Sequence, residues 1–346
     1  MKEITELLNQ GVKLGDFPGA SYAVVYRNGF IDKDFVGYKQ IFPNKIKNKG
    51  NELYDSASLT KVIVTTTLIL KLIEDKKISL NSKISDILKN FKHKEVTIFD
   101  LLTHSSGLPA DIPNARSLRN RKDVLDKVFS FDLIYSTGKD IVYSDIGFII
   151  LGLIVEKLSK KTLDSFAKEV IFDPLKMHDT SFSPDKKRAA PTEYREDDVY
   201  KGLLMGRVHD EKAFALGGVS GHAGMFSTAS DLSKFILTIL NNDELVLKKE
   251  TVDMLFIPRI KSSKGVIRAL GWDKPTKGST AGDYVSFEDT ILHTGFTGCN
   301  LWIDRSKGIG FVMLSNAVHP HREDNNIRKY RNKIGNIILS NKEKNL

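Results

Sequence analysis

Cysteine is nearly absent from the 346-residue chain, which contains Cys299 alone. One cysteine excludes an intramolecular disulfide framework and a metal cluster built from several cysteines. We expect Cys299 to fill a small apolar space in a strand. The longest apolar runs, such as residues 148–158, are too short and too soon charged to cross a bilayer. The first residues lack the continuous apolar stretch of a signal peptide, so we expect a cytoplasmic protein without stable membrane association.

Positive charge is in excess, but it is not concentrated. The net charge is +9 and the pI is near 9.2, values compatible with an anionic partner such as nucleic acid. Lysines are nevertheless scattered among glutamates and aspartates along the chain. The dense basic run beside an aromatic residue, at 327–336, is typical of the polar face of a terminal helix. We therefore expect a solvated surface and no nucleic-acid partner.

Strand patterns occur near both ends of the chain, and helical patterns fill the middle. Asn28-Gly29 joins two β-rich runs, which predicts a hairpin, and residues 304–308 join two more. With 41% hydrophobic residues, the chain can bury a substantial core. We predict one domain over 1–346 of the α+β class, an antiparallel sheet flanked by helices. The sheet part comprises about 1–88 and 206–346, and an all-α subdomain is inserted at about 89–205.

A serine and a lysine stand at the start of an apolar helix predicted for residues 58–74. Positions i and i+3 share a helix face, so the Lys61 ammonium can reach the Ser58 hydroxyl. The helix N-terminus adds unpaired N–H groups and partial positive charge, which favour an alkoxide or an oxyanion. The alternative is a serine N-cap beside a solvated lysine. Spacing alone does not decide, because a lysine also follows three positions after Ser136, Ser165 and Ser183.

Two further motifs follow in order, Tyr143-Ser144-Asp145 before an apolar helix and His293-Thr294-Gly295 in a strand. With Ser58-x-x-Lys61, they resemble the motif set of the serine β-lactamase and penicillin-binding protein superfamily, in its class C-like branch. The resemblance covers nearly the whole chain, through FPGASYAVVYRNG, SASLTKV, LLTHSSGLP, GGVSGHAGMFSTASDLSKF and HTGFTG. More narrowly, residues 190–195 and 206–224 resemble the N-acetylmuramoyl-L-alanine amidases that work beside an N-acetylglucosaminidase in muropeptide recovery.

The resemblance implies a role for each motif. Ser58 would attack a carbonyl and become acylated, with the positive charge of Lys61 beside it. Tyr143 would be the general base, which requires neighbouring cations such as Lys61 to lower its pKa from the free value of about 10. The backbone N–H groups of Ser58 and Phe296 would hold the oxyanion. No cofactor is implied.

Two departures from the family pattern concern the substrate. His293 stands where many penicillin-interacting enzymes have lysine, and a histidine is mostly neutral near pH 7. It would be a weaker anchor for the carboxylate of a penicillin or of a D-Ala-D-Ala terminus. Asp145 stands where asparagine is usual and adds negative charge near Lys61. Both changes weaken the expectation of efficient β-lactam binding. Thr294 and Gly295, beside His293, are expected to belong to the substrate-binding set.

His209, Asp210 and His222 form a further polar group on glycine-rich connections. Histidines and a carboxylate can bind zinc, but these residues lack tight ligand spacing and the serine chemistry requires no metal. We therefore expect no metal here. We expect the three side chains to line the substrate pocket or to order its loops, and a plain surface position is the alternative.

The leading hypothesis is a serine amidase that removes the peptide from N-acetylmuramic acid through an acyl-enzyme. The alternatives within the fold are a promiscuous carboxylesterase, a weak class C-like β-lactamase and a D-alanyl-D-alanine peptidase. A non-catalytic module that binds cell-wall fragments is an alternative of another class. An α/β-hydrolase is disfavoured because residues 218–222, the nearest match to Gly-x-Ser-x-Gly, lack the final glycine. The expected partner is a small muropeptide, ester or β-lactam-like substrate.

Overall fold

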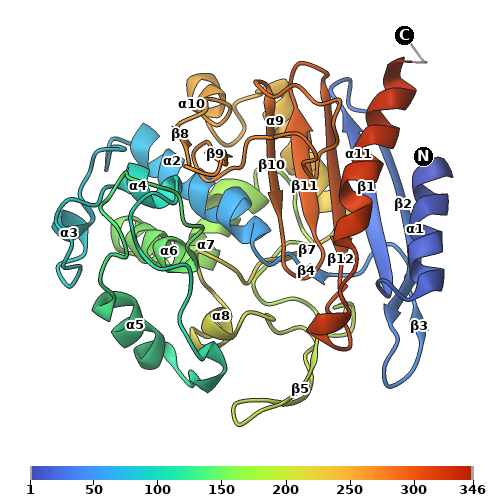
Figure 1. Cartoon of the computed structure of the whole chain (residues 1–346), viewed down its shortest axis with the longest axis horizontal. Helices are drawn as coiled ribbons and strands as arrows, with labels where there is room; N and C mark the ends of the chain where they lie inside the picture. The colour runs from blue at the N-terminus through green and yellow to red at the C-terminus, as the bar shows by residue number, and fades with distance from the viewer. Residues whose placement is uncertain (1, 344–346) are drawn as a thin grey trace.

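A six-stranded antiparallel sheet forms the centre of the computed structural model, which describes residues 2–343 (Figure 1). The strand order is β10-β11-β12-β1-β2-β3. The strands are β1 Gly19–Tyr26, β2 Ile31–Gln40, β3 Ile46–Lys47, β10 Thr290–Thr294, β11 Asn300–Asp304 and β12 Ile309–Ser315. β1 pairs with β12, from Ala20↔Ser315 to Tyr26↔Ile309, so segments from both ends of the chain build one sheet. The predicted α+β class, an antiparallel sheet flanked by helices, is confirmed.

Local sequence explains the two long hairpins of the sheet. Between β1 and β2, Gly29 has a φ of +87°, a left-handed conformation that glycine adopts without a Cβ clash. Between β11 and β12, the Asp304 carboxylate accepts hydrogen bonds from Lys307 N at 2.9 Å and Ser306 Oγ at 2.8 Å, which closes the turn. Cys299 is buried directly before β11 and belongs to the larger apolar core.

Helices cover both faces of the sheet. α1 (Lys2–Leu14) and α11 (Arg328–Glu343) pack together on one face, as Figure 1 shows at the right of the molecule. α9 (Ala229–Asn241) contacts β1 and β12 from the other face. Successive side chains of β1 point to opposite faces of the sheet. Tyr22 and Val24 therefore pack in the core under α1 and α11, and Ala23 and Val25 pack in the larger core on the other face.

Helical segments between the two halves of the sheet carry most of the larger core. They are α2 Thr67–Glu74, α3 Ile84–Ile87, α4 Ile98–Leu102, α5 Arg121–Ser130, α6 Asp145–Ser159 and α7 Leu163–Ala167, with the π-helices η1 Lys61–Thr66 and η3 Lys168–Phe172. The predicted helix is present from residue 59 to Glu74, and its first part contains the π-helical turn η1. π-Helical turns are rare and frequently lie at functional sites. Among residues 2–343, none of the helices combines the length and apolar character that a membrane crossing requires.

Short strand pairs and short helices complete the fold. They are β4 Tyr54–Asp55 with β7 Phe226–Ser227, β5 Tyr194–Glu196 with β6 Lys201–Leu203, β8 Ile260–Lys261 with β9 Ile267–Arg268, and the helices α8 Glu211–Ala215, α10 Lys249–Met254, η2 Ala115–Ser117 and η4 Arg322–Asp324. The β5-β6 hairpin lies in a stretch that we expected to be helical. The β4-β7 pair matters for the site, because it places the turn before Ser58 beside the loop of residues 217–224.

Helix α6 approaches this loop unusually closely. A Cβ added to Gly152 would lie 2.9 Å from Gly221 N, and a Cβ added to Gly221 would lie 2.1 Å from the carbonyl oxygen of Phe148. Such distances leave no room for a methyl group. The two glycines thus let the helix backbone touch the loop, and the contact fixes the position of His222.

Gly152→Ala is expected to lower the free energy of unfolding by about 1–3 kcal/mol, because the methyl group forces the helix and the loop apart. Gly147→Ala, in the same helix, is the matched control, since its Cβ would meet Leu101 Cδ2 at an ordinary 3.5 Å. The control should change stability by no more than ~1 kcal/mol, in the stabilising direction. Urea unfolding measures both effects, and equal stability of the two variants would contradict the proposed contact.

Candidate active site

Ser58 lies on a turn that buried hydrogen bonds hold in place. Ala57, directly before it, has a φ of +46°, a strained value for a residue with a Cβ. The buried Asp55 supports this turn, because its Oδ1 accepts from Ala57 N at 2.9 Å. Its Oδ2 accepts from His209 N at 2.7 Å, which ties the turn to the loop before α8. The local strain is therefore compensated by an anchored carboxylate.

Lys61 is fully buried and points its ammonium at Ser58. Lys61 Nζ lies 3.0 Å from Ser58 Oγ, 3.0 Å from the His222 carbonyl oxygen and 2.7 Å from Asp145 Oδ1. Burial alone would lower the pKa of Lys61, but Asp145 and then Tyr143 outweigh burial and raise it. Lys61 is therefore an ammonium at neutral pH, and the alternative of a solvated lysine is wrong.

Tyr143 lies over the same ammonium and lines the cleft together with Ser58. Its ring centroid is 4.9 Å from Lys61 Nζ and 5.3 Å from the Arg268 guanidinium carbon. Burial raises the pKa of Tyr143 above the free value, and the Asp145 carboxylate adds to this, whereas Lys61 acts in the opposite direction. The expectation that cations lower this pKa is therefore wrong, because loss of hydration is the larger effect. Tyr143 is a neutral phenol in the resting site.

Two neutral imidazoles flank the tyrosine. His293 is buried, and its Nδ1 donates to the Thr294 carbonyl oxygen at 2.9 Å. Burial, with Arg268 and Lys61 nearby, lowers the pKa of His293 well below its usual value. The imidazole is therefore neutral at pH 7, as the sequence led us to expect. His104 accepts from Ser144 N at 2.9 Å, and its ring lies 4.6 Å from that of Tyr143. His104 thereby fixes the Tyr143-Ser144-Asp145 segment.

The cleft in front of Ser58 is about 420 Å³ in volume and is rich in arginine. Arg268 of β9 lines it and pairs with Asp273 at 2.6 Å, while Arg328 and Arg331 of α11 line it from the sheet side. The sequence analysis did not identify these arginines, because none belongs to a motif. The histidine at position 293, where the family pattern often has lysine, was the available signal, because it leaves the positive charge of the cleft to other residues.

The two residues predicted to hold the oxyanion, Ser58 and Phe296, line the same cleft. A Cβ added to Gly295 would lie 2.7 Å from the Ser56 carbonyl oxygen, so glycine is needed where the end of β10 meets the turn before Ser58. In the described chain, neither Ser58 N nor Phe296 N donates a backbone hydrogen bond. Thr294 is half-buried beside them on the wall of the cleft.

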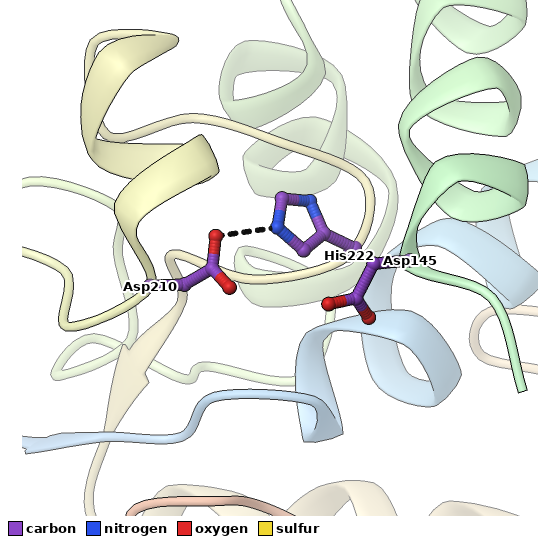
Figure 2. Close-up of side chains that lie close together, drawn as sticks. All are labelled: Asp145, Asp210 and His222. Atoms are coloured by element: carbon purple, nitrogen blue, oxygen red, sulfur yellow. Dashed lines mark hydrogen bonds and ion pairs between the residues drawn. The ribbon is translucent and has the colours of Figure 1, made fainter. Parts of the chain in front are cut away.

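The group of His209, Asp210 and His222 is divided between two places. Asp210 Oδ1 lies 2.7 Å from His222 Nε2, and both residues lie close to Asp145 (Figure 2). His209 points away from them, toward Glu193 Oε2 at 3.1 Å, and stacks on Phe296. None of the three lines the cleft of Ser58. Their hydrogen bonds agree with the other predicted role, the ordering of loops, but they form no single cluster.

Lys212 closes the network behind the site and was not identified from the sequence. Its Nζ lies 3.3 Å from Asp145 Oδ2, 2.9 Å from Asp210 Oδ2 and 2.7 Å from Asp111 Oδ1, although the side chain is only 2% exposed. Burial opposes its charge, but the carboxylates raise the pKa of Lys212. Asp145, Asp210 and His222 have the ligand types and spacing for a metal ion. A metal ion does not fit there, because the ammonium groups of Lys61 and Lys212 already pair with the carboxylate oxygens of Asp145 and Asp210.

Comparison with known proteins agrees with this geometry. A family model described as Beta-lactamase matches residues 4–336. The N-acetylmuramyl-L-alanine amidase of Bacillus subtilis (strain 168) is 29% identical, over 92% of this chain and 81% of the relative. A putative D-alanyl-D-alanine carboxypeptidase of Escherichia coli (strain K12) is also 29% identical, over 92% and 82%. A class C beta-lactamase superposes with a TM-score of 0.74 at 19% identity over 96% of this chain and 95% of that one. EstCE1, a hydrolase with promiscuous acyltransferase activity, gives 0.73 at 18% identity over 95% and 97%.

Lys212→Met is expected to lower the free energy of unfolding by about 3–5 kcal/mol at pH 7, because it removes the buried cation that Asp145 and Asp210 share. Lys168→Met is the matched control, since its exposed pair with Asp173 should contribute no more than ~1 kcal/mol. The folded pKa values of Asp145 and Asp210 are lowered, so their stabilisation exists above about pH 3.9 and is lost on acidification. Urea unfolding from pH 3 to 8 should show the Lys212→Met deficit shrink below about pH 4. A deficit no larger than that of the control would contradict the network.

Proposed function

The chain belongs to the beta-lactamase family of serine hydrolases, and we propose that it cleaves the amide bond between N-acetylmuramic acid and L-alanine in recovered peptidoglycan fragments. One observation carries the choice of substrate. The segment 206–224, which resembles the muropeptide amidases, contributes directly to the catalytic centre. Its His222 carbonyl oxygen accepts from Lys61, and its Lys212 pairs with Asp145. The curated amidase of Bacillus subtilis supports the same choice.

In the proposed reaction, Ser58 Oγ attacks the lactyl carbonyl carbon of the muramoyl group. The Oγ proton moves to Tyr143 in its phenolate form, which Lys61 and Arg268 stabilise, and the N–H groups of Ser58 and Phe296 hold the oxyanion. Tyr143 then donates this proton to the departing nitrogen of L-alanine as the C–N bond breaks. Water attacks the ester on Ser58, passes a proton through Tyr143 and releases N-acetylmuramic acid. Lys61 stays charged throughout, because Asp145 holds its counter-charge.

The arginines of the cleft favour a second candidate, a D-alanyl-D-alanine carboxypeptidase. Arg268, Arg328 and Arg331 line the space in front of Ser58 and could receive the terminal carboxylate of a peptide. A relative with this putative activity has the same identity to the chain as the amidase. The two reactions release different products, a complete peptide or a single D-alanine.

Ser58→Ala is expected to abolish release of peptide from an N-acetylmuramoyl pentapeptide that begins with L-alanine and ends in D-Ala-D-Ala, because it removes the nucleophile. Mass spectrometry of the products from wild type and variant measures this, with a nitrophenyl ester and nitrocefin assayed in parallel. Ser165→Ala, in an exposed copy of the Ser-x-x-Lys spacing, is the matched control and should retain full activity.

Each outcome of this assay has a distinct meaning. Release of the complete peptide by the wild type and by Ser165→Ala, but not by Ser58→Ala, supports the amidase. Release of D-alanine alone would replace it with the carboxypeptidase. Ester or nitrocefin turnover without either product would retain the serine mechanism and reject both substrates. Peptide release by Ser58→Ala at the wild-type rate would refute the mechanism itself.

The kcat/KM of the wild type is expected to rise with pH from 7 to about 10 without levelling off. The base must be deprotonated, and burial raises the pKa of Tyr143 above the free value of about 10, so the phenolate fraction grows throughout this range. Tyr143→Phe should lower kcat/KM by about 100-fold or more and remove the rise. Tyr26→Phe, on β1 and outside the cleft, is the control. A flat profile above pH 7, or a rise that persists in Tyr143→Phe, would show that another group takes the proton.

A further inference from the structure

The side chain of Phe296 is an exposed aromatic surface inside the catalytic cleft. It is 48% exposed and lines the same space as Ser58, although the proposed reaction uses only its backbone N–H. Its carbonyl oxygen accepts from Asn325 Nδ2 at 3.1 Å, which holds the backbone of this turn. A large apolar ring left half-exposed beside a reaction centre is available for contact with substrate.

The protein supports this ring from behind. The His209 imidazole stacks on it with a centroid distance of 5.7 Å and an interplanar angle of 24°. The Arg322 guanidinium carbon lies 5.8 Å from the ring centroid. Both supports are fixed, because His209 donates its backbone N–H to Asp55 and contacts Glu193, which also receives two hydrogen bonds from Arg322. The ring is therefore held in a defined orientation.

Charged groups continue from this support toward solvent. Arg116, which is 49% exposed, pairs with Glu193 at 3.1 Å and with Glu211 at 3.3 Å, and Arg322 joins the same two carboxylates. Burial would raise the pKa of Glu193, but His209 and Arg322 hold it well below its usual range, so the carboxylate is charged. The ring thus has an ionic border. A wholly apolar ligand would remove water from these charged groups without offering them hydrogen bonds, and this costs free energy.

We propose that Phe296 is the platform for a pyranose ring, the sugar of the acyl half of the substrate, with the Arg116 and Glu211 border facing its hydroxyl and acetamido groups. A pyranose has one face of C–H groups that packs on an aromatic ring, and its polar substituents require the directional partners that an apolar ligand lacks. This inference rests on the proposed function, because it names how that same site recognises the muramoyl group.

The test compares two substrates that share one scissile bond, N-acetylmuramoyl-L-alanyl-D-isoglutamine and D-lactoyl-L-alanyl-D-isoglutamine, which lacks the sugar. In the wild type, kcat/KM should be higher for the sugar substrate. Phe296→Ala should reduce this preference about tenfold or more, as expected when the packing of an aromatic surface is lost. Phe296→Trp should retain the preference. Phe287→Ala, at another exposed phenylalanine outside the cleft lining, should leave both rates unchanged.

The preference is the ratio of the two kcat/KM values within each variant. General damage to the oxyanion site lowers both values and leaves their ratio unchanged. An equal loss on both substrates in Phe296→Ala would overturn the platform. If the wild type cleaves neither substrate, the proposed amidase fails, and binding then decides the platform separately. Saturation-transfer NMR with N-acetylmuramoyl-L-alanyl-D-isoglutamine should show the strongest contact at the pyranose C–H protons in the wild type and its loss in Phe296→Ala. Contact confined to the peptide protons would also overturn it.

Discussion

A buried ammonium needs a compensating charge, and the Lys61–Asp145 pair meets this need at the centre of the protein. An uncompensated Lys61 would cost several kcal/mol at a position with no exposure to water. Its partners come from separate segments, namely the turn at Ser58, the first residue of α6 and the loop at His222. The charge can be accommodated only when η1, α6 and that loop are packed together. The close contact between Gly152 and Gly221 holds α6 against that loop.

The charges behind the nucleophile extend as one chain of alternating sign. Lys61 pairs with Asp145, Asp145 with Lys212, and Lys212 with Asp210, which meets His222. Asparagine at position 145, the residue usual in the family pattern, would need no second lysine. The aspartate in this chain is one of three carboxylates, with Asp111 and Asp210, whose charge Lys212 balances. Position 293 holds a neutral histidine, and Arg268 joins Lys61 as a second cation over the Tyr143 ring.

Much of this arrangement could be predicted from the sequence, and the rest depended on information that sequence patterns do not contain. The two hairpins and the ordered motifs of Ser58, Tyr143 and His293 were predictable, since turn chemistry and motif order are local. Lys212 and Arg268 were not, because lysine and arginine are common and their partners are distant in the chain. The direction of the Tyr143 pKa shift was also beyond the sequence. It follows from the balance between burial and nearby charge, which exists only after folding.

The pairing of β1 with β12 determines when this protein can become active during its synthesis. β1 leaves the ribosome early, but its neighbour β12 and the strand that carries His293 are made almost three hundred residues later. Until then, one edge of β1 has no partner, and the wall of the cleft opposite Ser58 does not exist. Such distant pairing makes folding slow and leaves unpaired strand edges exposed meanwhile. A nascent chain that already contains Ser58, Lys61 and Tyr143 therefore has its nucleophile but no enclosed site in which to use it.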